Sequence, residues 1–182
     1  MARKNLLITG PPGCGKTTLL KAIAGELADL NPSGFFTEEV KAGGIRQGFE
    51  IVSCTGGGRG LLAYTGLKSR YRIGKYGVDL EAFERFLSKV PFRQPHKIFV
   101  IDEIGKMECL SEKFREIAER LLNGPVPVIA TIAHQGDDFI EEIKTRGDIV
   151  LVVITKENRD EALPLILARV RQMLDEKGIS RD

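Results

Sequence analysis

Short apolar runs alternate with longer stretches of helical periodicity along most of the chain. The runs at 6–9, 98–101, 126–133 and 149–154 are apolar at nearly every position, which predicts strands buried on both faces. Between and after these runs, apolar residues recur every three or four positions, which predicts amphipathic helices. Those positions are Leu19, Leu20, Ile23, Ala24 and Leu27; Leu80, Phe83, Leu87 and Val90; Phe114, Ile117, Ala118, Leu121 and Leu122; and Leu163, Ile166, Leu167, Val170 and Leu174. Strands and helices in this order predict a three-layer α/β fold around a mostly parallel sheet.

Residues 35–54 interrupt this alternation. The sequence predicts strands at residues 35–40 and 48–54. The pair Gly43-Gly44 between them predicts that they form a hairpin, inserted at the edge of the sheet. The following stretch, 55–77, begins with three glycines and is rich in Lys and Arg, which predicts the most flexible and most basic segment. Its arginines, Arg59, Arg70 and Arg72, are candidates for an arginine finger on a mobile flap, with a solvated basic loop as the alternative.

Length and composition indicate one globular domain. The chain has 182 residues, of which 42% are hydrophobic, so residues 1–182 can bury a core of their own as a single domain. The formal net charge is only +2, so the sequence does not have the strong positive charge that favours binding to nucleic acid or to an anionic membrane. A protein partner is not identifiable from the sequence.

Targeting and cysteine patterns favour a cytoplasmic location. The amino end lacks the apolar core of a signal peptide, and the longest strongly apolar run, 149–154, is too short to cross a bilayer. The three cysteines are far apart and show neither a CxxC motif nor a ligand-like Cys/His spacing. This pattern argues against a disulfide framework or a zinc site, and therefore favours a reducing compartment.

Residues 10–17, Gly-Pro-Pro-Gly-Cys-Gly-Lys-Thr, satisfy the pattern G-x-x-x-x-G-K-[ST] between a predicted strand and a predicted helix. Glycines let the backbone curl so that successive N–H groups point at a phosphate beside the positive end of a helix dipole. A lysine in this position neutralises the β- and γ-phosphate oxygens, and the hydroxyl group that follows can bind Mg²⁺. The predicted nucleotide-binding residues are Gly10, Pro11, Pro12, Gly13, Cys14, Gly15, Lys16, Thr17 and Thr18.

Two carboxylates, Asp102 and Glu103, follow the apolar run at 98–101. At the carboxyl end of a buried strand, Asp102 is expected to hold Mg²⁺ together with Thr17, because this cation prefers oxygen ligands. Glu103 is then expected to polarise the water that attacks the γ-phosphate. Ile104 and Gly105 complete the candidate nucleotide site around this pair.

A guanine-specific GTPase is not favoured. Asp102 to Gly105 fits the D-x-x-G switch motif, and Thr155 to Asn158 approaches the guanine signature [NT]-K-x-D. However, Asn158 stands where a carboxylate is needed to accept two hydrogen bonds from the guanine edge. Asp102 also lies 86 residues after Lys16, with strands and a helix between them, which is the additional-strand arrangement more typical of ATPases with a catalytic glutamate.

Asn158 and Arg159 follow the last predicted strand, where a nucleotide base could lie. Arg159 could stack on the base at the rim of the site, which would give loose base specificity. The alternative is that Asn158 caps the last helix. Since Pro164 would then occupy the sixth helical position and break a backbone bond, we expect the helix to start near Asp160 or Glu161 and to leave Asn158 free.

Several segments, in order along nearly the whole chain, resemble the THEP1 nucleoside-triphosphatase family. They are residues 9–18, 34–40, 46–49, 77–80, 101–108 and 155–160. The resemblance implies a RecA/AAA-like variant of the P-loop fold and slow, Mg²⁺-dependent hydrolysis of several nucleoside triphosphates, with broad base tolerance. It also implies nucleotide contacts from residues 10–18, metal binding by Thr17 and Asp102, and activation of water by Glu103.

Two other functions remain open from the residues alone. In a small-molecule or nucleoside kinase, the basic stretch 55–77 would act as a lid over a second substrate. In a nucleotide-gated binding module, turnover would depend on a protein or RNA partner, although the near-neutral charge speaks against RNA.

Overall fold

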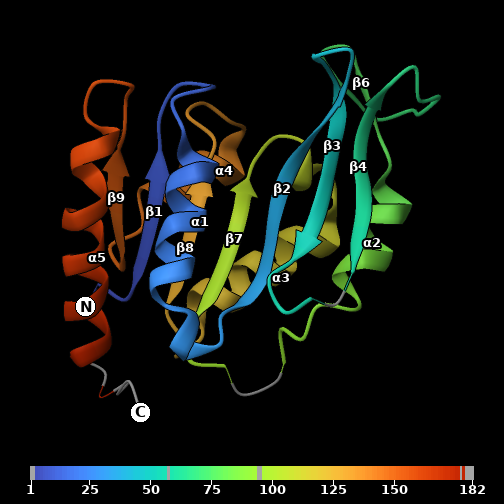
Figure 1. Ribbon diagram of the computed structural model, residues 1–182. Helices are drawn as coiled ribbons and strands as arrows, with labels where there is room; N and C mark the ends of the chain where they lie inside the picture. Colours follow the sequence, from blue (N-terminus) through green and yellow to red (C-terminus); the bar gives the residue numbers. More distant parts are fainter. Residues whose placement is uncertain (1–2, 57, 94–95, 177, 179–182) are drawn as a thin grey trace.

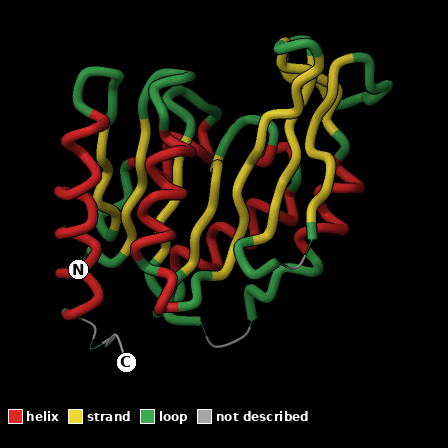
Figure 2. The backbone as a smooth tube through the Cα atoms, viewed as in Figure 1, coloured by secondary structure: helices red, strands yellow, loops and turns green. Residues whose placement is uncertain are grey.

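The computed structural model describes residues 3–56, 58–93, 96–176 and 178. Within them, one nine-stranded sheet runs in the order β5-β6-β4-β3-β2-β7-β8-β1-β9, with helices on both faces (Figures 1 and 2). The strands are β1 (Asn5–Thr9), β2 (Ser33–Ala42), β3 (Ile45–Ser53), β4 (Arg59–Thr65), β5 (Arg72–Ile73), β6 (Tyr76–Val78), β7 (Phe99–Ile104), β8 (Val128–Ile132) and β9 (Ile149–Val153). The helices are α1 (Lys16–Glu26), α2 (Leu80–Leu87), α3 (Glu112–Asn123), α4 (Asp138–Lys144) and α5 (Arg159–Asp175), with the 3₁₀ turns η1 (Ala28–Leu30) and η2 (Glu108–Leu110). No helix in this part of the chain is long and apolar enough to span a membrane.

The sheet is mixed, so the prediction of a mostly parallel sheet is wrong. β1, β2, β7, β8 and β9 pair in parallel, whereas β2 to β6 are joined by antiparallel pairings. The predicted hairpin corresponds to β2 and β3, but it is not at an edge, because β4, β6 and β5 extend the sheet beyond it. Residues 55–77, predicted to be flexible, contain β4, β5 and the first two residues of β6.

Two cores cover the two faces of the sheet. On one face, α1 and α5 pack over Leu6 and Ile8 of β1. On the other face, α2, α3 and α4 pack over residues that include Leu7 of the same strand. Because successive side chains of a strand point to opposite faces, the continuous apolar run of β1 supplies both cores. The predicted three-layer arrangement is confirmed.

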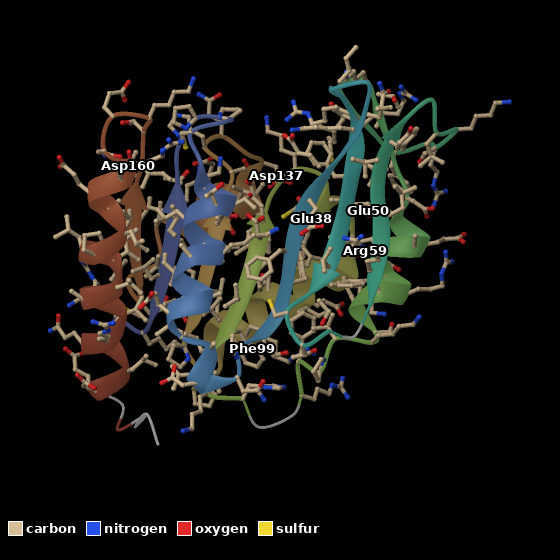
Figure 3. All side chains as sticks on the ribbon, in the orientation of Figure 1. Glu38, Glu50, Arg59, Phe99, Asp137 and Asp160 are labelled. Carbon is tan, nitrogen blue, oxygen red and sulfur yellow. The ribbon has the colours of Figure 1, made fainter. Side chains whose placement is uncertain are left out.

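The antiparallel half of the sheet differs strongly between its two faces. On the helix-covered face, Phe35 of β2 is fully buried and makes edge-to-face contacts with Phe83, Phe86 and Phe114 at centroid distances of 6.0–6.1 Å. On the opposite face, Glu38, Glu50 and Arg59 extend from neighbouring strands (Figure 3), and Arg59 pairs with both carboxylates at 2.7 and 3.5 Å. Arg59 therefore belongs to the sheet, not to a mobile flap as predicted.

The carboxyl ends of the parallel strands meet at one edge of the sheet, at the top of Figure 1. The loop after β1 leads there into α1, and β7 ends at the same edge with Asp102 and Glu103. β8 lies between β1 and β7 in the sheet, although it follows both of them along the chain. In open α/β sheets, this edge is where ligands bind.

The aromatic cluster around Phe35 provides a test of the core. Phe35→Ala leaves a large cavity between β2, α2 and α3, so we expect the free energy of unfolding to fall by about 3–5 kcal/mol. Ile45→Ala, at a position that is 63% exposed, serves as the control and should change it by less than about 0.5 kcal/mol. Urea unfolding followed by circular dichroism measures both values, and a loss below about 1 kcal/mol for Phe35→Ala would contradict the assignment.

Candidate functional site

The loop between β1 and α1 is shaped by two of its glycines, Gly10 and Gly15. A Cβ atom on Gly10 would stand 2.1 Å from the carbonyl oxygen of Ile154, so any other residue would displace one of the two segments. Gly15 has a φ of +103° and directly precedes the first helical residue, Lys16. The first intrahelical bond of α1 runs from the amide of Leu19 to the carbonyl of Gly15. The amides before Leu19 therefore lie at the helix terminus, where a phosphate can accept from them.

Other predicted loop residues lie on two sides of this turn. Pro11, Pro12 and Gly13 are exposed, whereas the side chain of Cys14 is buried in the core beneath α1 and α5. Cys14 can therefore contribute its backbone but not its thiol to a ligand above the loop.

The ammonium group of Lys16 lies beside Gly10, the first residue of the loop. Its Nζ donates to the carbonyl oxygen of Gly10 at 3.1 Å and lies 3.8 Å from Oε2 of Glu103. The Lys16 side chain is only 10% exposed, so water screens its charge weakly. A phosphate in the loop would meet this cation directly.

Thr17 and Asp102 are in contact, as the prediction of a shared metal ion requires. The Asp102 carboxylate is fully buried, and the Thr17 hydroxyl beside it favours its charged form. The same carboxylate accepts from the Thr131 hydroxyl at 2.6 Å and from the Thr37 amide at 3.3 Å. Burial raises the pKa of Asp102, and these hydrogen bonds oppose the shift because they favour the charged form.

Sequence reasoning missed Thr37 and Thr131 because each comes from a strand that is distant along the chain. Thr131 did carry a signal, since it is a polar residue in the middle of the buried apolar strand β8. Thr37 carried none, because a threonine in a half-exposed strand is ordinary.

Glu103 lies beside Asp102 with its side chain partly exposed. Burial raises the pKa of the Glu103 carboxyl group, the nearby Lys16 lowers it, and the negative charge of Asp102 raises it again. Ile104, the next residue, is buried in the core and anchors the end of β7. The carboxylate of Glu103 therefore points into the same space as Lys16, on a rigid strand end.

Glu108 is a second glutamate that sequence reasoning did not single out. It lies on η2 and is only 5% exposed. A Cβ atom built on Gly105 would stand 2.7 Å from Oε2 of Glu108 and 3.0 Å from Oε1 of Glu103, so both carboxyl groups flank this glycine. Burial raises the pKa of Glu108 well above its usual range, and the charge of Glu103 adds to the shift.

The structure corrects the predictions for Asn158 and the start of the last helix. Asn158 is not free, because its side chain accepts from the Thr155 amide at 2.8 Å and donates to the Val153 carbonyl at 3.3 Å. α5 begins at Arg159 and includes Pro164, so the expected start near Asp160 or Glu161 is one or two residues late. Asn158 occupies the position before the helix without capping it through its side chain.

Arg159 lies over the loop that precedes α1. A Cβ atom on Gly15 would stand 3.1 Å from Cδ and 3.3 Å from a terminal nitrogen of Arg159. The Nε of Arg159 also donates to Asp160 at 3.1 Å. The guanidinium group is therefore close to the amino end of α1, as the prediction of a nucleotide contact requires.

Comparison with known proteins gives a consistent result. The sequence model of a family described as NTPase matches residues 5–167. The nucleoside-triphosphatase THEP1 of Thermotoga sp. strain RQ2 is 43% identical over 94% of this chain and 98% of its own length. The solution structure of a human cancer-related nucleoside triphosphatase has a TM-score of 0.79 at 37% identity and covers 93% of this chain and 98% of that one. The crystal structure of THEP1 from Aquifex aeolicus has a TM-score of 0.78 at 36% identity, with 91% and 98% coverage.

The buried Glu108 makes stability depend on pH in a defined direction. In the folded protein its pKa is raised above 4.5, so the folded state keeps a proton that the unfolded chain releases near this pH. Raising the pH above about 4.5 therefore favours unfolding through this group. Relative to the wild type, Glu108→Gln should gain up to about 1.4 kcal/mol of unfolding free energy per pH unit over this window.

Urea unfolding between about pH 4.5 and pH 7.5 measures this difference for Glu108→Gln and for the exposed control Glu116→Gln. The control should differ from the wild type by a constant amount. A constant difference for Glu108→Gln as well would show that Glu108 is ionised in the folded protein.

Proposed function

The chain belongs to the NTPase family of nucleoside-triphosphatases, and from this premise we propose that it uses Mg²⁺ to hydrolyse nucleoside triphosphates with broad base specificity. The observation that carries the proposal is the position of Thr17 beside the buried carboxylate of Asp102, next to the Lys16–Glu103 pair. This position joins the phosphate loop to the acidic end of β7. We assign the fold to a RecA/AAA-like variant of the P-loop class, in which the antiparallel strands β3 to β6 are an extension of the parallel half.

The β1–α1 loop is proposed to hold the triphosphate. Residues 10–15 supply backbone amides, and the amino end of α1 adds its positive dipole. Lys16, now bonded to the Gly10 carbonyl, would exchange this weak partner for phosphate oxygens. Thr18, exposed one residue beyond Thr17, is the proposed contact for the α-phosphate.

The donor set beside the loop fits Mg²⁺. Thr17 and Asp102 offer a hydroxyl and a carboxylate oxygen, which are hard ligands, and a cation of this kind usually keeps several waters and binds substrate phosphates. Mg²⁺, when bound, would neutralise charge on the β- and γ-phosphate oxygens. Thr131 and Thr37 would orient the Asp102 carboxylate through the hydrogen bonds that they already donate.

Glu103 is proposed to orient the attacking water and to accept its proton. Its Oε2 atom lies 3.8 Å from the Lys16 ammonium, and therefore beside the expected position of the γ-phosphate. Burial raises the pKa of this carboxyl group, which makes the carboxylate a stronger base than one in water. The oxygen of the water would form a bond to the γ-phosphorus, and a proton of the water would pass to Glu103. At the same time, the bond between the γ-phosphorus and the β-phosphate oxygen would break.

Broad base specificity follows from the residues near the expected base position. Arg159 lies over Gly15 and can contact or stack on a nucleotide without reading the edge of its base. Asn158 is bonded to its own loop, so it does not offer the paired acceptors that select guanine. The cytoplasm is the proposed compartment, which fits the three free cysteines.

Phosphate release from purified protein tests the proposed reaction. ATP, GTP, CTP and UTP should all release phosphate at rates within about tenfold of one another, because neither Asn158 nor Arg159 is placed to select one base. Chelation of Mg²⁺ should abolish release from each. Diphosphate formation only when an acceptor molecule is added would instead indicate a kinase, and turnover only with a partner would indicate a nucleotide-gated module.

Two substitutions separate binding from chemistry. Glu103→Gln should keep nucleotide affinity, measured by calorimetry, but lower kcat by about 10²–10⁴-fold because the base is removed. Lys16→Ala should weaken the binding of the Mg²⁺–nucleotide complex itself. Glu116→Gln, an exposed substitution on α3, is the control with unchanged turnover. Wild-type kcat in Glu103→Gln would remove Glu103 from the mechanism.

A further inference from the structure

The two oxygens of Glu103 have different neighbours. Oε2 faces Lys16 at 3.8 Å, on the side where the phosphates are expected. Oε1 lies 3.0 Å from the point where a Cβ on Gly105 would stand, and Oε2 of Glu108 lies 2.7 Å from the same point. Because Gly105 has no side chain there, the carboxyl groups of Glu103 and Glu108 approach across it. Since both oxygens lie within 3.0 Å of this one point, they are less than about 6 Å apart, a separation that one bridging water can span.

Glu108 is held firmly in this position. It begins η2, which is fixed to the end of β7 by a hydrogen bond from the Cys109 amide to the Gly105 carbonyl at 2.9 Å. The Ser111 amide donates to the Glu108 carbonyl at 3.1 Å, which closes the turn before α3. The side chain is almost completely buried, so its carboxyl group has a defined place behind Glu103.

The surroundings of Glu108 favour an uncharged carboxyl group. The charged groups that act on it are the carboxylates of Glu103 and Asp102, and both oppose a third negative charge. Burial removes the water that would otherwise stabilise an anion. An uncharged carboxyl group has an O–H donor, whereas a carboxylate has none. Glu108 can therefore donate to its neighbour Glu103.

We propose that Glu108 is a positioning residue for the hydrolysis, whose uncharged carboxyl group donates a hydrogen bond to Oε1 of Glu103 and thereby directs Oε2 toward the attacking water. This inference rests on the proposed role of Glu103 as the base.

The need for such a partner arises when the nucleotide binds. Lys16 then turns to the phosphate oxygens, and its contact with Oε2 of Glu103 no longer orients that side chain. A glutamate side chain has several rotatable bonds, and a base misplaced by 1 Å can lose about 10²-fold in rate. Glu108 lies near Oε1 of Glu103, whereas Lys16 lies near Oε2, so Glu108 can hold the carboxylate and leave Oε2 to the water.

Substitutions at Glu108 test this role through the split between kcat and nucleotide affinity. Glu108→Met keeps the approximate volume but removes the donor, so kcat should fall about 10–100-fold while the nucleotide Kd from calorimetry stays unchanged. Glu108→Gln keeps an N–H donor and should retain kcat within about threefold of the wild type. Glu116→Met, the exposed control on α3, should leave both values unchanged.

A second disruptive variant and a double mutant complete the experiment. Glu108→Asp shortens the side chain by one methylene group and moves the carboxyl group away from Glu103, so kcat should fall as in Glu108→Met. This variant takes the place of Glu108→Met in the experiment if the methionine variant does not fold. In the Glu103→Gln background, Glu108→Met should cause no further loss of kcat, because no base remains to be positioned.

The results that overturn the inference are distinct from those that overturn the proposed function. Wild-type kcat in Glu108→Met or Glu108→Asp would exclude the positioning role while leaving Glu103 as the base. An equal loss of kcat in Glu108→Gln and Glu108→Met, or a parallel loss of nucleotide affinity, would indicate a merely structural residue. Full turnover in Glu103→Gln, or no phosphate release by the wild type, would overturn both proposals together.

Discussion

The buried carboxylate of Asp102 is the constraint on which the rest of the site depends. A charge with no access to water is strongly unfavourable unless hydrogen bonds compensate it. Thr37 of β2 and Thr131 of β8 donate such bonds to Asp102, and the Thr17 hydroxyl of α1 lies beside the same carboxylate. These bonds tie together elements that are far apart along the chain. The β1–α1 loop, the strand that carries Asp102 and the strand between them therefore have one relative arrangement, which is what a shared metal ion requires.

Two other carboxyl groups at the same edge of the sheet have different environments. Glu103 keeps partial exposure and the neighbouring cation Lys16, whereas Glu108 is buried and is influenced mainly by negative charges. Environments of this kind separate the protonation states of chemically identical side chains. One glutamate is thus suited to accept a proton and the other to keep one, and the absence of a side chain at Gly105 allows them to approach.

The parallel half of the fold was predictable because its strands are continuous apolar runs separated by periodic helices. The antiparallel extension was not, because β5 and β6 have only 2 and 3 residues, and a register shift in the β3–β4 pairing breaks the alternation, so that Leu62 and Ala63 are both buried. The start of α5 was missed for another reason. Pro164 removes one helical hydrogen bond, but the residues around it, such as Ala162 and Ile166, are buried in the core and stabilise the helix.

The sequence by itself identified the candidate phosphate loop and the pair Asp102–Glu103, because each is a contiguous motif of neighbouring residues. The tertiary structure alone decided which side chains surround that pair. Thr37, Thr131 and Glu108 reach it through strand pairing, through the turn at η2 and through the packing of buried segments. Contacts of this kind depend on the position of the whole backbone, and no local pattern of residue types encodes them.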